Sequence, residues 1–263
     1  MGVPGRLAWV IGASSGIGHA SALRLARDGW TVALSGRREA ELGDTLAQIT
    51  AEGGQAITVP VDASLPGDVA RAHRLIAGQC GDVSLLLHSA GTNVPSRWWD
   101  DLDPAAVRRT VEVNMLSVVE AVAAVLPGMR AARAGRIVVL GSWAGWRFMS
   151  VAGAAYSGSK QALSGVVESI NDQEGRSGIS ATLVIPAEVA TEIMTTRPSP
   201  PSAEELAAML RPGDVANMIS VIASLPAHVC INEIVVSNVL NGIYLRDSYY
   251  HGPVTFAQSE VAV

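Results

Sequence analysis

The chain has 263 residues, 49% of them hydrophobic and 16% charged, which suits a single α/β domain with a large apolar core. A formal net charge of −5 excludes the broad basic surface that is typical of nucleic-acid-binding proteins. The sequence shows neither a secretory leader nor about 18 consecutive uncharged apolar residues, so we expect a soluble, cytoplasmic protein without a membrane span.

The first predicted strand, Leu7–Ile11, leads into a glycine-rich turn and then a helix over 20–26. The turn reads Gly12-Ala13-Ser14-Ser15-Gly16-Ile17-Gly18. Glycines let the backbone approach a pyrophosphate closely, and free N–H groups at a helix N-terminus bind its charge. The spacing is not that of the G-x-G-x-x-G fingerprint, and no lysine follows as in a P-loop. A nucleotide-binding turn is the favoured interpretation, and an ordinary tight strand-to-helix turn is the alternative.

The end of the second predicted strand, 31–34, indicates which dinucleotide would bind. A dinucleotide fold places the residue that reads the ribose about 20 positions after the glycine turn. An acidic side chain there would accept a hydrogen bond from a free 2′-hydroxyl, but this stretch carries Arg37 and Arg38. Two guanidinium groups suit a 2′-phosphate, so NADP is favoured over NAD. The alternative is that both arginines only begin a solvated helix.

Beyond Arg38, short apolar strands alternate with helices. We predict strands over 56–61, 83–87, 136–140, 179–185 and 233–237, and helices over 39–51, 66–80, 103–134, 156–175, 202–210 and 214–225. This alternation predicts one doubly wound parallel sheet of about seven strands, with helices on both faces and ligands beyond the carboxyl ends of the strands. Within the longest helical pattern, Pro127 should kink or divide the helix.

Tyr156 and Lys160 lie four positions apart on a predicted helix, so their side chains should share one face. The unperturbed pKa of a phenol is about 10, and an adjacent cation lowers it. Lowering it to near 7 takes roughly 4 kcal/mol, which a unit charge about 4 Å away supplies at an effective dielectric constant of about 20. The pair is therefore interpreted as a general acid/base, and a surface helix with an amphipathic tyrosine is the alternative.

The order and spacing of these pieces are similar to those of the short-chain dehydrogenase/reductase family, in its compact branch, over roughly residues 7–237. The resemblance implies a catalytic set of Asn114, Ser142, Tyr156 and Lys160. It implies that NADP(H) is bound by Gly12, Ser14, Ser15, Gly16, Ile17, Gly18, Arg37, Arg38, Asp62, Ala90, Gly91, Tyr156, Lys160, Pro186, Val189 and Thr191. The implied activity is hydride transfer between NADPH and a carbonyl or secondary alcohol, by a homodimer or homotetramer.

The resemblance also implies a role for each catalytic residue. Ser142 and Tyr156 bind the substrate carbonyl, and Tyr156 delivers the proton. Lys160 lowers the pKa of Tyr156 and holds the nicotinamide ribose. Asn114, through a kink in its helix, anchors a water that relays protons to Lys160.

Three positions depart from the family's pattern. Ile11 replaces the usual threonine before the first glycine, so a side-chain hydrogen bond that steadies the turn is missing. His88-Ser89 replaces a pair of asparagines, and Ala187 replaces the glycine of a Pro-Gly turn. None of these changes removes a catalytic group.

Bulky apolar side chains gather on loops expected at the mouth of the site: Trp98, Trp99, Trp143, Trp146, Phe148 and Met149. They favour a pocket for a bulky apolar, cyclic or aromatic ketone, with loop packing or a subunit contact as the alternative. Glu188 either accepts a hydrogen bond from a substrate hydroxyl or ammonium or faces water. The candidate substrate residues are Trp143, Trp146, Glu188 and Met194.

The expected organisation is one domain over 1–240, with a lid over about 191–212 and a tail over 241–263 that we associate with a subunit contact. The histidines have no metal-ligand spacing, so no bound metal is expected. Cys80 and Cys230 should both be buried and reduced. Two other functions stay open. One is an NAD-dependent alcohol dehydrogenase of the same family, which would require an acidic residue near Gly36, and the other is a non-catalytic dinucleotide-sensing regulator.

Overall fold

Both faces of the central sheet are covered, and the first strand shows why. In β1 (Leu7–Ile11), Trp9 and Ile11 belong to one buried cluster, whereas Ala8 and Val10 belong to another. Successive side chains of a strand point to opposite faces of the sheet. A strand that is apolar at every position therefore needs a layer of helices on each side.

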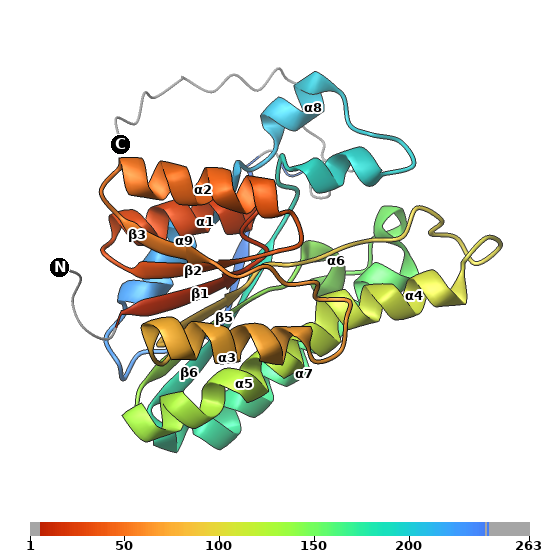
Figure 1. Ribbon diagram of the computed structural model, residues 1–263. Coiled ribbons are helices and arrows are strands. Elements are labelled where there is room, and N and C mark those ends of the chain that lie inside the picture. The colour runs from red at the N-terminus through yellow and green to blue at the C-terminus, as the bar shows by residue number, and fades with distance from the viewer. Residues whose placement is uncertain (1–5, 240, 242–263) are drawn as a thin grey trace.

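The computed structural model describes residues 6–239 and 241, and over this part of the chain seven parallel strands form a single sheet (Figure 1). The strand order is β3-β2-β1-β4-β5-β6-β7. The strands after β1 are β2 (Thr31–Ser35), β3 (Gln55–Thr58), β4 (Leu85–His88), β5 (Gly135–Leu140), β6 (Ile179–Pro186) and β7 (Glu233–Val236). The predicted doubly wound parallel sheet is confirmed, with strand ends that shift by a few residues.

Two layers of helices enclose the sheet, one above it and one below it in Figure 1. The upper layer contains α1 (Gly16–Arg27), α2 (Glu39–Ala51) and α9 (Pro212–Ser224). The lower layer contains α3 (Asp68–Cys80), α5 (Ser117–Ala132) and α7 (Gly153–Glu174). Each layer buries one of the two apolar clusters against the sheet.

Shorter helices gather at the end of the sheet where the strands finish (Figure 1). They are α4 (Pro104–Val111), α6 (Trp143–Trp146) and α8 (Ala203–Ala208). A π-helix covers Glu112–Leu116, and 3₁₀ turns cover Ser150–Ala152, Gly175–Ser177 and Glu192–Thr196. Except for Gly175–Ser177, which precedes β6 at the opposite end of the sheet, these segments surround the carboxyl ends of the strands, where a parallel sheet binds its ligands.

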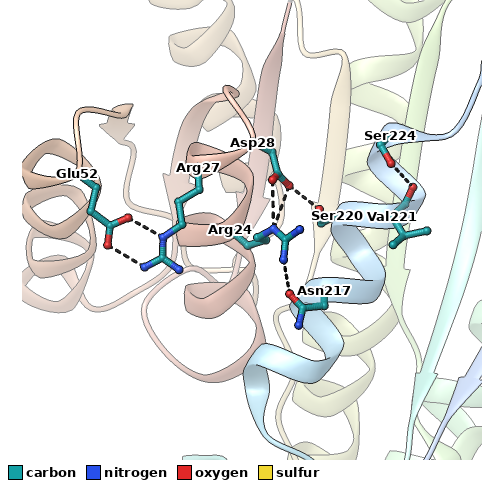
Figure 2. A network of polar contacts seen from close by, with 8 residues as sticks. All are labelled: Arg24, Arg27, Asp28, Glu52, Asn217, Ser220, Val221 and Ser224. Carbon is teal, nitrogen blue, oxygen red and sulfur yellow. Dashed lines mark hydrogen bonds and ion pairs between the residues drawn. The ribbon is translucent and has the colours of Figure 1, made fainter. Parts of the chain in front are cut away.

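Polar side chains join the first helix of the upper layer to the last. Figure 2 shows the Arg24 guanidinium between Asp28 and Asn217, with its Nε 3.1 Å from Oδ1 of Asp28. The Ser220 hydroxyl donates a hydrogen bond to Oδ2 of the same aspartate at 2.5 Å. Since the bonds to Asn217 and Ser220 span 193 and 192 positions of the chain, they fix α9 against α1 and complete the layer.

The predicted long helix is interrupted at Asn114, where the family resemblance implies a kink, and not at Pro127. α5 continues through Pro127, and the α-helical pattern is broken instead by the π-helix, which contains Asn114. A proline removes the hydrogen bond to the carbonyl four residues earlier. That residue, Ala123, and Pro127 itself are both exposed, so solvent can satisfy the carbonyl. The expectation that Pro127 divides the helix is wrong.

The helical run Pro104–Ala132 has 29 residues and contains an 18-residue window with a mean hydropathy of 1.5, enough in length and composition alone for a membrane span. Its inward side chains, among them Val118, Val125 and Met129, belong to the apolar cluster under the sheet. A core helix of a soluble protein meets the same two criteria. Because 33% of its most apolar window is buried, packing in the core accounts for the inward face of this run.

The two cysteines and the tail are the remaining parts of the chain for which the sequence makes a structural prediction. Cys80 and Cys230 are free, but both are exposed, so the expectation that they are buried is wrong. Cys80 is the last residue of α3 and Cys230 lies just before β7, where the chain leaves the core. The predicted tail over 241–263 lies outside the described residues, apart from Asn241.

Two glycines give a matched test of packing. A methyl group on Gly18 would lie 2.1 Å from the carbonyl oxygen of Gly12, whereas one on the exposed Gly43 of α2 would meet nothing within 4 Å. We expect Gly18→Ala to lower the free energy of unfolding by about 1–3 kcal/mol through overpacking. Gly43→Ala should raise it by up to about 1 kcal/mol through helix propensity. Urea unfolding measures both changes, and a loss of the same size in the two variants would contradict the contact.

Candidate active site

A cavity of about 710 Å³ lies beyond the carboxyl ends of the strands, among the turns that follow β1, β2, β4, β5 and β6. Most of the predicted site residues line it: Gly12, Ser14, Ser15, Gly16, Ile17, Arg37, Arg38, Asp62, Ala90, Gly91, Ser142, Trp143, Tyr156, Lys160, Pro186, Glu188, Val189, Thr191 and Met194. Gly18, Asn114 and Trp146 do not line it. Of the predicted lid, 191–197 contributes to the wall.

The glycine turn forms one part of the wall. Gly12 has a φ of 93°, and a methyl group there would lie 2.6 Å from the backbone nitrogen of Ala90, so only glycine fits. Gly16 begins α1, and Ser15 at the N-cap makes no side-chain capping bond. The N–H groups of the first helical turn are therefore open to an anion. This turn fits a pyrophosphate group.

The turn is held in place without the threonine that Ile11 replaces. The Ser35 carbonyl at the end of β2 accepts hydrogen bonds from the backbone N–H groups of Gly12 at 2.7 Å and Ala13 at 2.9 Å. The Ser35 hydroxyl accepts a hydrogen bond from Nε1 of Trp9 at 2.9 Å. One buried serine on the neighbouring strand thus supports the turn from its backbone side.

Charged side chains at the ends of β2 and β3 line the next part of the wall. Arg37 is exposed, and no ion pair of the described residues includes it. Nη1 of Arg38 lies 2.9 Å from Oε2 of Glu192. Oδ1 of Asp62 accepts hydrogen bonds from the N–H and the hydroxyl of Ser64, which leaves Oδ2 for a ligand. Arg37 is therefore the arginine better placed for a phosphate.

The Lys160 ammonium is buried beside the end of β5. Its Nζ donates to the Leu140 carbonyl at 2.7 Å. Burial lowers the pKa of Lys160 to about 8. A methyl group on Gly91 would lie 3.6 Å both from this Nζ and from Oδ1 of Asn114, so the ammonium and the amide are near neighbours. Lys160 can therefore exchange a proton close to neutral pH.

Tyr156 lies one turn before Lys160 on α7, and the Ser142 hydroxyl hydrogen-bonds its oxygen. The phenol is surrounded by protein but open to the cavity. Burial raises the pKa of Tyr156 above its ordinary value, against the Ser142 hydrogen bond and the guanidiniums of Arg197 and Arg97. The expected lowering of this pKa by Lys160 is not found, and the lysine ammonium binds the carbonyl at the end of β5. At neutral pH the phenol keeps its proton.

Asn114 is fully buried in the π-helix and binds two neighbouring segments. Its Oδ1 accepts from the N–H of Thr92 at 2.8 Å, and its Nδ2 donates to the Thr92 carbonyl at 2.9 Å. The same Nδ2 donates to Oγ of Ser159 on α7 at 3.0 Å. The amide therefore fixes the loop after β4 to the helix that carries Lys160.

His88 ends β4 at the position where the family's pattern has an asparagine. Its Nε2 lies 2.8 Å from Oγ of Ser117, and the Ser117 hydroxyl donates to the Val113 carbonyl. Because a serine has one hydrogen to donate, Nε2 of His88 must carry the proton of their shared bond. Burial, and then the charge of Lys160, lowers the pKa of His88 to about 3. A neutral imidazole thus ties β4 to the π-helix.

Another part of the wall is apolar. It is lined by Trp143, Met149, Val151, Ile193 and Met194. Trp146 supports this part from outside, since its ring packs edge-on against Trp143 with 5.1 Å between the ring centroids. The guanidinium of Arg147 covers the face of the Trp146 ring at 4.0 Å.

The remaining aromatic residues of the predicted mouth lie elsewhere. Trp98, Trp99 and Phe148 are exposed and do not line the cavity. Of the six side chains expected around a bulky ketone, Trp143 and Met149 reach the wall. Sequence position alone located the loops but could not tell which way each side chain points.

Besides Arg109 of α4, two arginines outside the predicted site also line the cavity. Arg97 is buried. Nη2 of Arg197 lies 2.7 Å from Oε1 of Glu188. Glu188 was expected to bind substrate or face water, but its carboxylate pairs with this lid cation. Neither arginine belongs to a motif, and their partners lie on distant loops, so no signal in the sequence marked them. Among the described residues, no group of three or more His, Cys, Asp or Glu side chains could hold a metal ion.

Comparison with known proteins agrees with this geometry. The sequence model of the family described as short chain dehydrogenase matches residues 6–201. Glycine betaine reductase of Emericella nidulans is 31% identical over an alignment of 241 residues, and the match covers 88% of this chain. The match covers only 18% of that much longer relative.

Two solved structures share the fold over nearly their whole length. A variant of actinorhodin polyketide ketoreductase with NADPH gives a TM-score of 0.83 at 26% identity, covering 92% of this chain and 99% of that one. A metagenomic short-chain oxidoreductase in complex with NADP gives a TM-score of 0.77 at 27% identity, covering 88% and 96%.

His88 should make the fold sensitive to acid. Its pKa of about 3 in the folded protein lies below the ordinary 6.5, so between these values the unfolded chain binds the extra proton. Its contribution is therefore complete above pH 6.5 and is lost as the pH falls. Between about pH 7.5 and pH 5 we expect the wild type to lose about 2 kcal/mol more stability than His88→Asn, measured by urea unfolding.

The exposed His228 provides the matched substitution, because His228→Asn removes a histidine without touching β4. Equal losses in the wild type and in His88→Asn would contradict a buried neutral imidazole at position 88.

Proposed function

The chain belongs to the short-chain dehydrogenase family, and on that premise we propose that it is an NADP(H)-dependent oxidoreductase that interconverts a ketone and a secondary alcohol. One observation carries the proposal: Ser142, Tyr156 and Lys160 meet at a cavity whose wall also contains the glycine turn. Ser142 and Tyr156 offer hydroxyl donors to a carbonyl oxygen, and the glycine turn offers N–H groups to a pyrophosphate. Hydride transfer needs the carbonyl and the dinucleotide to be bound in one cavity.

The proposed chemistry divides the work between cofactor and chain. NADPH, when bound, supplies the hydride that reduces the carbonyl carbon. Ser142 and Tyr156 donate hydrogen bonds to the carbonyl oxygen, which stabilises the negative charge that develops there. Tyr156 then gives its proton to that oxygen, a general acid step that typically contributes about 10²–10⁴-fold. The raised pKa of the phenol keeps that proton in place until it is needed.

Lys160 supports the return of the proton. Its pKa of about 8 lets the ammonium release and regain a proton near neutral pH. In our proposal Lys160 also holds the nicotinamide ribose, and the π-helix around Asn114 anchors the water that relays protons to it. Oxidation of an alcohol uses the same groups in reverse.

NADP(H) would be held by the glycine turn, by Asp62 at the adenine and by Arg37 at the 2′-phosphate. The free Oδ2 of Asp62 and the unpaired guanidinium of Arg37 support this arrangement. Thr191, proposed to lie beside the nicotinamide, borders the glycine turn, since a methyl group on Gly16 would lie 3.1 Å from its Cγ2. Two solved structures of similar fold contain NADP or NADPH, which also favours the phosphorylated cofactor.

For the substrate we propose a bulky apolar, cyclic or aromatic ketone. The apolar part of the wall, with Trp143, Met149 and Met194, supports this choice. The polyketide ketoreductase of similar fold carries a ketone-reducing activity in its name, and that activity is a proposal for this chain.

We further propose a cytoplasmic homodimer or homotetramer with one catalytic domain over 1–240. Leu116 and Val119 are exposed apolar side chains on the helical run that the family resemblance places between subunits. The lid over 191–212 would close the site, because Glu192 and Arg197 already reach across to Arg38 and Glu188. The tail over 241–263 would add to the subunit contact.

Tyr156→Phe tests the chemistry. We expect kcat for ketone reduction to fall at least about 10²-fold, because the variant lacks the proton donor, while the Kd for NADPH stays nearly unchanged. NADPH consumption over a panel of ketones and quenching of NADPH fluorescence measure the two quantities. Retained turnover would sink the assignment, and a wild type that binds NADPH but reduces no ketone would favour a dinucleotide-sensing regulator.

Arg37→Ala tests the cofactor. We expect KM for NADPH to rise about 10–100-fold, since a charge-assisted hydrogen bond contributes about 1.5–3 kcal/mol, with no change in KM for NADH. Arg74→Ala, on the exposed side of α3, removes an equal charge outside the cavity. A higher kcat/KM for NADH than for NADPH in the wild type would favour the NAD-dependent alcohol dehydrogenase instead.

A further inference from the structure

Arg97 is a buried cation at the cavity wall. Its side chain is only 6% exposed, and among the described residues no carboxylate lies within ion-pair distance of it. Taking an unpaired charge out of water costs several kcal/mol, so buried arginines normally meet an anion. The cavity is the place from which that anion can come.

Backbone carbonyls fix the direction of this guanidinium without neutralising it. Nε donates to Val94 at 3.0 Å, Nη1 to Val151 at 2.6 Å and Nη2 to Thr196 at 3.2 Å. These bonds join the loop after β4, the turn before α7 and the lid. A guanidinium has five N–H groups, so two of those on Arg97 remain without an acceptor among the described residues.

The charge around Arg97 is positive overall. Burial, and then the charge of Arg197 in the same cavity, lowers the pKa of Arg97, so the two guanidiniums are near enough to repel each other. Glu188 pairs with Arg197 at 2.7 Å, so the negative charge of one carboxylate stands against the positive charge of two guanidiniums. Both arginines also favour the phenolate of Tyr156, so the positive charge lies close to the proton donor.

We propose that Arg97 binds a carboxylate of the substrate, so that the enzyme reduces keto acids and oxidises hydroxy acids. The proposal rests on the function proposed above and names the class of ketone. A planar carboxylate accepts parallel hydrogen bonds from two N–H groups of one guanidinium. The apolar body of the same molecule would lie against Trp143 and Met194.

The reaction balances with the carboxylate unchanged. Hydride from NADPH forms the new C–H bond, the π electrons of the carbonyl move to oxygen, and that oxygen takes the proton of Tyr156. NADPH becomes NADP⁺, and one proton is taken up from solvent when Tyr156 is restored. A substrate ammonium fits this wall less well, because Glu188 already pairs with Arg197.

Matched acids and esters test the proposal. The probes are phenyl ketones in which none, one, two or three methylene groups separate the ketone from a carboxylate, each paired with its methyl ester. In the wild type we expect kcat/KM for the best acid to exceed that of its ester at least about tenfold. Arg97→Met should lower the ratio of kcat/KM for the acid to kcat/KM for its ester at least about tenfold.

The ratio of acid to ester separates recognition from folding. Arg97 also holds three loops, and a misfolded fraction would lower both values but not their ratio. Arg108→Met removes an exposed arginine of α4 that does not line the cavity, and it should keep the ratio of the wild type. A wild-type ratio near one, or the same ratio in the wild type and in Arg97→Met, would overturn the proposal.

If the protein consumes no ketone, the proposed function is wrong. A binding measurement then tests the carboxylate site by itself. With NADPH present, phenylbutyrate should raise the Tm of the wild type and of Arg108→Met but not that of Arg97→Met. Phenylbutanol, which has the same apolar body without the charge, should have little effect. No shift with the acid, or an equal shift with the alcohol, would overturn the carboxylate site.

Discussion

The buried amide of Asn114 fixes the positions of the reactive groups. Its three hydrogen bonds join the loop after β4 to α7, and they are made from a π-helix rather than a regular turn. On the other side of that π-helix, His88 reaches Ser117, whose hydroxyl binds the Val113 carbonyl. Each buried polar group left unpaired would cost about 1–3 kcal/mol, so the irregular helix is held from both sides. The position of Lys160 follows from this arrangement.

Electrostatics in the cavity is a balance between burial and nearby cations. Burial raises the pKa of Tyr156 and lowers that of Lys160, so each group moves toward its neutral form. Arg97 and Arg197 oppose the first shift by favouring the phenolate. A carboxylate bound to Arg97 would offset that support and keep the phenol protonated for donation. Substrate charge and acid strength are therefore linked through one side chain.

Departures from the family's pattern are compensated locally. The turn after β1 lacks the usual threonine, and Ser35 supports it instead through a carbonyl that accepts two N–H groups. His88 replaces an asparagine and still supplies a donor to the helix layer, as a neutral imidazole. In both cases the backbone geometry is kept while the polar contact comes from another residue. Such exchanges are invisible to a comparison of motifs.

The sequence by itself determined the parallel sheet, its helices, the glycine turn and the pairing of Tyr156 with Lys160, because each depends on spacing within one segment. Apolar residues that face the core recur with the period of their helix or strand, and residues four positions apart share one face of a helix. Only the tertiary structure decided the uninterrupted helix at Pro127, the exposed tryptophans, the raised pKa of Tyr156 and the cations Arg97 and Arg197. These depend on which loops meet, and hydrogen bonds to backbone carbonyls across 54 and 99 positions leave no periodic trace in the chain.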